Sequence, residues 1–417
     1  MAQTNDKQLN KNKNKPFSKL NKSKHFKPIK PDQKIYSFYI NNYPTNGRRA
    51  PRCNGGDISL VTAALMPLTH AELRDRFRAT LLGAAIGDAL GFPYEGAPPA
   101  TLRRLPHIAD DFAPRPRGGR LPRGIFSDDT QMMLAVAESI LISGKIDGRT
   151  IAACIAKLWR EGFILYADQV CTEAVNRLLE GTPWMSSGSP IGMATNSAAV
   201  RAAPIGLFQF DAQARIHRDA ETQGVITHKD PRSIAGGAAM AAAVAISLGD
   251  PLPADTFCLR VAAIVRLLDP DLARHIEQLP QLLSFEPSDA ARVISNAGLP
   301  PHQPKDRVGI SNFVYPSVLM AFYGALRARG DFRNCMEMVL LAGGDTDSVA
   351  CMAGALMGAQ YGCAILPSSL CKGVFDGARV VQIADALFEL KERSLPREVA
   401  IATSARRNTG RFPTWRG

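Results

Sequence analysis

The 417-residue sequence lacks an apolar run long enough to cross a membrane. Its most apolar stretch, IAGGAAMAAAVAISL at 234–248, has 15 residues, whereas a membrane-spanning helix needs about 20. The first residues, MAQTNDKQLNKNKNK, also lack the apolar core of a secretory signal. We therefore predict a cytoplasmic protein without a membrane-spanning helix.

Paired cysteine motifs are missing as well. The eight cysteines include no C-x-x-C pair, and most of them lie in apolar segments. A small secreted fold held by disulfides is therefore excluded, and the sequence predicts reduced, mostly buried thiols, as is usual in cytosolic proteins.

Acidic side chains are scarce only at the N-terminus. Residues 1–66 carry thirteen Lys and Arg against three Asp, a net charge of +10, whereas the remaining 351 residues carry 37 basic and 35 acidic side chains. The overall charge of +12 is thus a property of a Lys/Asn-rich extension, and it gives no reason to expect nucleic acid at the body of the protein. We predict three parts: a flexible basic extension (1–66), a catalytic domain (67–397) and a short basic tail (398–417).

Alternating β-branched runs, the usual mark of strands, are also missing from the body. Apolar residues recur instead at helical spacing, and Thr69 with Glu72 forms a capping box ahead of the first helix. Gly83 and Gly87 add a stripe of small residues suited to close helix contact. We predict an all-α globular domain, with Pro/Gly-rich loops at 91–126 and 181–196 and, after the first helix, helices at 129–143, 150–162, 168–180, 212–222, 232–248, 255–268, 271–283, 288–297, 314–329, 331–342, 347–362 and 376–393.

Two acidic clusters far apart in the sequence each precede an apolar helix. The first is Ser127-Asp128-Asp129-Thr130, and the second is Asp345-Thr346-Asp347-Ser348. Helix capping explains one Asp at each site, but not two with adjacent hydroxyls inside apolar flanks. Converging carboxylates would raise one another's pKa values unless a cation lay between them. Oxygen-only ligands favour Mg²⁺ or Mn²⁺.

Other polar residues in apolar segments are weaker candidates. Asp88, on a Gly/Ala-rich helix, is interpreted as a buried acid that accepts backbone N–H bonds. Glu95 lies in a Pro/Gly loop, and Asn196 follows a loop of small residues that would let a ligand approach the backbone. His228, at a helix entry, is by itself typical of a packed residue.

Taken together, these segments resemble the ADP-ribosylglycohydrolase family. The matching pieces are, in order, GAAIGDALGFPYEG, GIFSDDTQMML, NSAAVRAAP, THKDP and GGDTDSVACMAGALMGAQYG. The chain departs from the resemblance in reading Thr195-Asn196-Ser197 where members commonly have Gly-Asn-Gly.

The resemblance implies an all-α hydrolase that removes ADP-ribose from modified protein side chains, most directly arginine, with a binuclear Mg²⁺ or Mn²⁺ centre. The implied metal ligands are Ser127, Asp128, Asp129, Asp345, Asp347 and Ser348. Glu95, Asn196, His228 and Gly344 are implied to bind the substrate. The carboxylate that takes the proton of water stays open among Asp128, Asp129 and Glu95.

The N-terminal extension has three open interpretations. Some members of the family resemble this arrangement and serve as immunity proteins, in which an extension blocks an ADP-ribosylating toxin. The extension would then bind a toxin through its lysines and an aromatic patch containing Tyr36, Phe38 and Tyr39. The alternatives are a solubilising tail and, less favoured because Arg is rare in it, a nucleic-acid-binding arm.

Overall fold

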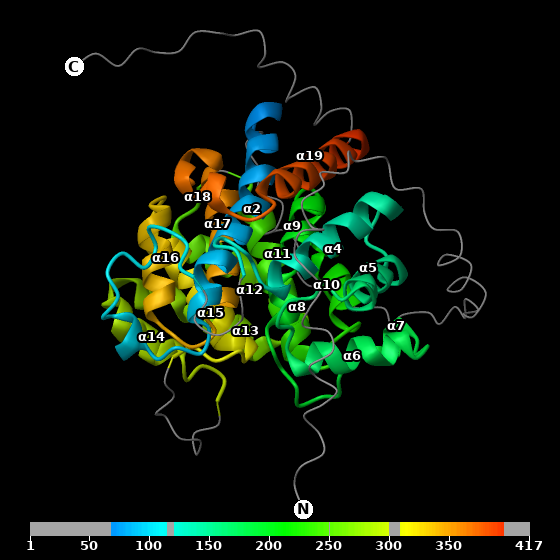
Figure 1. Ribbon diagram of the computed structural model, residues 1–417, viewed down its shortest axis with the longest axis horizontal. Helices are drawn as coiled ribbons and strands as arrows, with labels where there is room; N and C mark the ends of the chain where they lie inside the picture. The colour runs from blue at the N-terminus through cyan, green and yellow to red at the C-terminus, as the bar shows by residue number, and fades with distance from the viewer. Residues whose placement is uncertain (1–67, 115–120, 250, 300–308, 396–417) are drawn as a thin grey trace, which may run out of the picture. The chain divides into compact units, whose positions relative to one another are not determined.

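The computed structural model describes residues 68–114, 121–249, 251–299 and 309–395. Within these ranges the chain consists of helices joined by loops, with isolated β-bridges and no strand (Figure 1). The all-α prediction is confirmed. The predicted extension (1–66) and tail (398–417), together with Cys53, lie outside the described residues.

The helices of eight residues or more are α2 (His70–Gly91), α4 (Asp128–Ser143), α5 (Gly148–Glu161), α6 (Gln169–Leu179), α10 (Ile216–Gly224), α11 (Pro231–Ser247), α12 (Ala254–Val265), α13 (Pro270–Gln278), α14 (Pro287–Ile294), α15 (Val314–Ala328), α16 (Phe332–Leu341), α17 (Thr346–Tyr361) and α19 (Gly377–Ser394). The shorter ones are η3 (Phe92–Tyr94), α3 (Pro99–Leu102), α7 (Trp184–Ser187), α8 (Ser197–Val200), α9 (Ala203–Phe208), η4 (Gln213–Arg215), η5 (Leu279–Ser284), η6 (Cys363–Ile365) and α18 (Ser368–Gly373). None of the described helices is both long and apolar enough to span a membrane.

Local capping accounts for the start of most long helices. The capping box of Thr69 and Glu72 forms as predicted. Five further helices, α5, α6, α11, α13 and α16, each begin after an aspartate whose side chain accepts a backbone N–H of the first turn. These caps satisfy donors that no earlier carbonyl can reach, so the sequence fixes these boundaries locally.

Prolines and short segments account for the differences from the predicted helices. The predicted helix at 271–283 divides into α13 and η5, because Pro280 has no N–H to continue the α-helical bonding. The predicted helix at 212–222 divides into η4 and α10. The predicted loops at 91–126 and 181–196 contain η3, α3 and α7, and the sequence interpretation missed the short α8 and α9 before and after Ala202.

The centre of the fold is the antiparallel pair α2 and α17, which make the most extensive contact among the described helices. Their backbones touch at four-residue intervals: a Cβ on Gly87 would lie 2.0 Å from the carbonyl oxygen of Ala350, and one on Gly83 would lie 2.4 Å from that of Gly354. The small-residue stripe predicted on α2 is therefore a helix interface. At the C-terminal end of this stripe, Gly91 lies against Thr346, whose hydroxyl donates to the Gly91 carbonyl at 2.9 Å.

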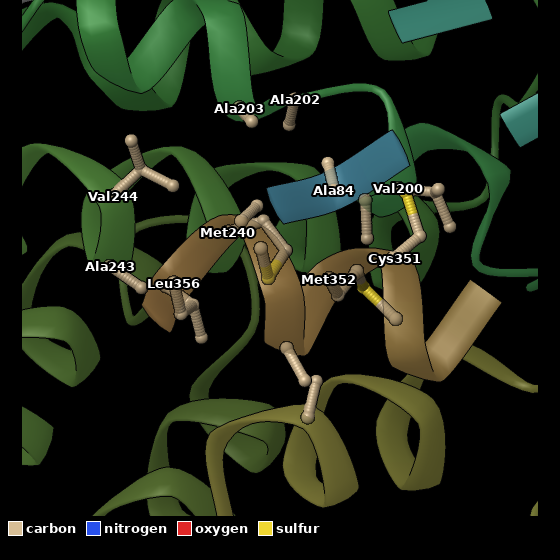
Figure 2. Packing of buried hydrophobic residues seen from close by; sticks show 14 of the residues in the cluster. Ala84, Val200, Ala202, Ala203, Met240, Ala243, Val244, Cys351, Met352 and Leu356 are labelled. Carbon is tan, nitrogen blue, oxygen red and sulfur yellow. The ribbon is translucent and has the colours of Figure 1, made fainter. Parts of the chain in front are cut away.

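The Ala-rich helix α11 packs beside this pair and is buried from Ser233 to Ser247. Figure 2 shows Met240 of α11 in the same packed region as Ala84 of α2 and Met352 of α17. Small side chains let three helices approach closely, which excludes water from the middle of the domain. The seven described cysteines form no disulfide with one another, and four of them are buried.

We expect Gly87→Ala to destabilise the protein by about 2 kcal/mol or more, because its added methyl meets the backbone of α17, which cannot rotate away. The measurement is the urea unfolding midpoint. Gly373→Ala is the matched control, since its methyl would meet the Phe112 ring at 3.1 Å instead of backbone. Equal midpoints for the two variants would contradict the interpretation of the α2–α17 contact.

Candidate active site

The two acidic clusters meet at the N-termini of α4 and α17. The Ser348 hydroxyl donates to Asp129 Oδ2 at 2.8 Å, which joins residues 219 positions apart in the chain. Ser127 caps α4 by accepting the Asp129 N–H at 3.2 Å. Of the six residues predicted to bind metal, five are buried and Asp345 is half-buried. The meeting follows from the α2–α17 pair, which places the first turn of α17 beside the end of α2.

Burial and mutual repulsion set the electrostatics of this cluster. Burial raises the pKa values of Asp128, Asp129 and Asp347 well above their ordinary range. Neighbouring carboxylates raise them further: Asp347 acts most strongly on Asp128, and Asp128 on Asp129. The pKa of Asp345 is also raised by burial. Such a group of carboxylates is unfavourable when ionised alone and is stabilised by bound cations.

Asp88 anchors the first cluster from α2. Its carboxylate accepts the N–H of Ser127 at 2.9 Å and that of Thr130 at 3.0 Å, and it also accepts the Thr130 hydroxyl at 2.6 Å. Asp88 is completely buried, and this burial raises its pKa. The structure confirms the interpretation of Asp88 as an acid that accepts backbone N–H bonds, and it shows that these bonds fix the start of α4.

Asn196 orients the second cluster. Its side-chain amide donates to Asp345 Oδ2 at 2.6 Å and to the Ser317 hydroxyl at 3.0 Å. The backbone N–H of Asn196 donates to the carbonyl of Asn312 at 3.0 Å. Asn196 is thereby held in place by both its backbone and its side chain, next to a predicted metal ligand.

Glu95 and Gly344 lie on adjoining loops beside the second cluster. The N–H of Gly96 donates to the Gly344 carbonyl at 2.7 Å, and the Gly344 N–H donates to Ala97 at 2.9 Å. Gly344 has a φ of 80°, and a Cβ there would lie 2.1 Å from the carbonyl oxygen of Ile310, so only glycine suits this position. Glu95 is exposed, and its charge contributes to the raised pKa of Asp347. This places an exposed carboxylate near the buried ones.

His228 is completely buried. Its Nε2 is 2.6 Å from the Thr195 hydroxyl, and its Nδ1 is 2.8 Å from the Thr227 hydroxyl. Burial, helped by the nearby Arg201 guanidinium, lowers the pKa of His228 to about 4. The imidazole is therefore neutral at physiological pH and reaches any ligand only through the residues that cover it.

Asp168 is the site residue that the sequence interpretation missed. It accepts hydrogen bonds from the Ser197 hydroxyl at 2.8 Å and from the Thr195 hydroxyl at 3.2 Å, and its charge raises the pKa values of both Asp128 and Asp345. In sequence it is one acid at the start of a predicted helix, which is the usual position of an N-cap. No local signal distinguishes it from the caps of α5 or α16.

Asp168 also belongs to a tight group of polar atoms. Within the described part of the chain, Asp168, Cys171 and His228 form the one set of three His, Cys, Asp or Glu residues whose ligand atoms all lie within 4.8 Å of one another. Burial raises the pKa of the Cys171 thiol well above its usual value, which disfavours the thiolate that metals prefer. Because both nitrogens of His228 already face hydroxyls, we interpret the group as a hydrogen-bonded cluster. The carboxylates of the two acidic clusters are more widely spread.

The loop before Asp168 contacts the start of α4, a role that the sequence interpretation did not assign to it. The Leu165 carbonyl accepts the N–H of Asp128 at 2.9 Å, and the Leu165 N–H donates to the Gln131 side chain at 2.9 Å. Tyr166 follows with a φ of 61°, and its ring lies edge-on to that of Phe92. The loop thus fixes the first residue of α4 and carries a half-exposed aromatic ring next to it.

Comparison with known proteins gives the family of the chain. The sequence profile of the family ADP-ribosylglycohydrolase matches residues 69–396. An uncharacterized protein of Archaeoglobus fulgidus is 32% identical over 321 residues, covering 77% of this chain and 98% of that protein. The ADP-ribosylarginine hydrolase Tri1 of Serratia proteamaculans is 25% identical over 328 residues, covering 77% of this chain and 81% of its own.

A solved structure gives the same fold. The ADP-ribosylglycohydrolase-related protein complex contains a chain that aligns with a TM-score of 0.61 and 23% identity, covering 77% of this chain and 99% of its own. The profile match, which spans most of the chain and includes both acidic clusters, shows the family: this chain is a hydrolase of the ADP-ribosylglycohydrolase family.

Proposed function

We propose that this protein is a metal-dependent hydrolase that removes ADP-ribose from modified protein side chains, with arginine as the acceptor. The observation that carries the proposal is the meeting of the two acidic clusters through the Ser348–Asp129 hydrogen bond. The choice of arginine is supported by the relative named as an ADP-ribosylarginine hydrolase and by the exposed carboxylate of Glu95, which suits a cationic guanidinium.

The donor set fits hard divalent cations. It offers carboxylates and hydroxyls only, and the raised pKa values of Asp128, Asp129 and Asp347 describe carboxylates that positive charge would stabilise. The residues that would hold two Mg²⁺ or Mn²⁺ ions are Ser127, Asp128, Asp129, Asp345, Asp347 and Ser348. When bound, such ions polarise the oxygens they contact and lower the pKa of water.

The protein's own residues supply orientation and proton transfer. Asp88 and the carbonyl of Leu165 fix the start of α4, which holds Asp128 and Asp129 in place. The amide of Asn196 holds Asp345. Cleavage of the glycosidic bond at the ribose requires a carboxylate to take the proton of the attacking water and requires the leaving guanidine to be protonated. Asp128, Asp129 and Glu95 are the candidates for the first role.

We expect Asp128→Asn and Asp347→Asn to lower the hydrolysis of an arginine-ADP-ribosylated protein in Mg²⁺ by at least about 10²-fold, because each removes a charged oxygen ligand at the reacting centre. The measurement is the rate of ADP-ribose release. Asp271→Asn, an exposed acid in the first turn of α13, is the matched control and should keep full activity. Unchanged rates in both site variants would refute the proposal.

We expect Mg²⁺ or Mn²⁺ to stabilise the EDTA-treated protein by about 2.7 kcal/mol at a hundredfold excess over Kd. Asp129→Asn should lose most of this response, yet should itself be at least as stable without metal, since it removes a repelling charge from a buried cluster. Thermal unfolding with and without metal measures both effects. An Asp129→Asn protein that responds to Mg²⁺ like the wild type would contradict the assignment of this ligand.

A second function, neutralisation of an ADP-ribosylating toxin by binding, is favoured by the net charge of +10 on residues 1–66. A basic extension can bind an acidic cleft through many weak charge pairs. This role would not need hydrolysis, and the two roles can coexist.

Deletion of residues 1–65 and the variant Asp128→Ala separate the two roles. We expect the deletion to abolish stoichiometric inhibition of a co-expressed ADP-ribosyltransferase toxin, and Asp128→Ala to leave that inhibition intact while hydrolysis is lost. Toxin affinity and survival of the expressing cells are the measurements. A deleted protein that binds the toxin as tightly as the full chain would exclude the extension as the binding element.

A further inference from the structure

Three consecutive side chains connect two acids on different elements. Thr195 and Ser197 both donate to Asp168 Oδ2, at 3.2 and 2.8 Å, while Asn196 between them donates to Asp345 Oδ2 at 2.6 Å. The segment therefore lies between the cap of α6 and the first residue of the second acidic cluster. Any movement of the two hydroxyls would also move the amide that holds Asp345.

The hydrogen bonds around Thr195 fix where the protons lie. A carboxylate only accepts, so the single proton of the Thr195 hydroxyl points to Asp168. The contact between Thr195 and His228 Nε2 must then be a donation from Nε2–H to the Thr195 oxygen. His228 is consequently the tautomer with its proton on Nε2.

The opposite side of His228 agrees with this assignment. Its Nδ1 carries no proton and accepts from the Thr227 hydroxyl at 2.8 Å. The Thr227 oxygen in turn accepts from Nη2 of Arg201 at 2.7 Å. Arg201 is completely buried and also donates to the side chain and carbonyl of Gln223. One ordered series of bonds thus runs from a buried cation through His228 to Asp168.

We propose that Asp168 is a positioning residue of this active site: through Thr195 and Ser197 it fixes Asn196, and thereby the orientation of Asp345, while the neutral His228 supports Thr195 from behind. This inference rests on the proposed function in assigning Asp345 to metal binding. Its chemistry is that of an outer-sphere carboxylate, a role whose loss typically costs 10- to 100-fold in metal affinity or activity.

Asp147 provides an internal comparison for Asp168. Both are N-cap aspartates whose side chains accept a backbone N–H of the first turn, from Thr150 at 3.0 Å and from Cys171 at 2.5 Å. Asp147 also accepts the Thr150 hydroxyl of its own helix, whereas Asp168 accepts a hydroxyl from a segment 27 residues away. If Asp168 only caps its helix, Asp168→Asn and Asp147→Asn should have the same effect on metal binding. If Asp168 positions Asn196, only Asp168→Asn should weaken metal binding.

The first experiment compares metal affinity in five full-length variants. We expect Asp168→Asn to weaken Mg²⁺ binding about tenfold by calorimetry, and Ser197→Ala and Thr195→Val to weaken it several-fold while the charge of Asp168 is retained. Asp147→Asn should bind Mg²⁺ like the wild type, with a loss of thermal stability similar to that of Asp168→Asn. The double variant Asp168→Asn/Ser197→Ala should be no weaker than Asp168→Asn, because both changes remove the same bond.

Two outcomes of this experiment would overturn the proposal. If Ser197→Ala and Thr195→Val bind Mg²⁺ normally while Asp168→Asn does not, Asp168 acts by its charge alone. If Asp168→Asn matches Asp147→Asn, it is only a helix cap. In the hydrolysis assay, with rates divided by the folded fraction of each variant, a positioning role lowers kcat more than it raises KM. A general loss of folded protein leaves these corrected rates unchanged.

The second experiment needs neither metal nor turnover. Nitrogen-15 NMR of the histidine-labelled protein, assigned with His228→Gln, is expected to show the His228 proton on Nε2. A proton on Nδ1 would reverse the order of the hydrogen bonds and overturn the inference. Since this measurement does not depend on hydrolysis, a protein without hydrolase activity would refute the proposed function and leave the positioning of Thr195 separately testable.

Discussion

The backbone contact between α2 and α17 is the constraint on which the candidate active site depends. At Gly87 and Gly354 a single methyl group would overlap the opposite backbone, so the two helices lie as close as peptide groups allow. Because they run antiparallel, the end of α2 reaches the start of α17. Asp88 then fixes α4 to the same place through two backbone N–H groups. The glycine contacts between α2 and α17 involve no charged group, yet they determine where the carboxylates of the two acidic clusters lie.

The site itself is a source of instability in the fold. Burial and repulsion both raise the pKa values of Asp128, Asp129 and Asp347, which means that the ionised forms are unfavourable in the absence of cations. Hydrogen bonds from Ser348 and Asn196 offset part of this cost. The apolar packing of α2, α11 and α17 supplies the rigidity that keeps such a cluster from relaxing apart.

The polar residues around Asn196 show how the fold accommodates Thr195 and Ser197 at positions where the family commonly has glycine. Thr195 and Ser197 place hydroxyls beside Asn196, and both hydroxyls find an acceptor in Asp168. The same acid caps α6. Buried polar groups stabilise a fold only when each of them has a hydrogen-bond partner. Here an unbroken series of hydrogen bonds connects Arg201 to Asp168 through Thr227, His228 and Thr195.

The sequence by itself determined the long helices, the capping box of the first one and the identity of the two acidic clusters. Those features depend on interactions between residues about four positions apart or fewer, such as the hydrogen bonds between Thr69 and Glu72. The spacing of residues along the sequence is therefore enough to predict them. The division of the predicted helix at 271–283 also has a local cause, the missing N–H of Pro280. The prediction missed it because the apolar period continues across the proline.

Only the tertiary structure decided which distant groups meet. Asp168 looks like Asp147 in the sequence, since both precede a helix, yet packing brings only Asp168 to the candidate active site. His228 lies beside an acid and a lysine in the chain but is completely buried in the fold. Contacts such as that between Ser348 and Asp129 join residues 219 positions apart. They form because close contacts between small residues set the positions of whole helices. A local sequence pattern does not show which helices will pack against each other.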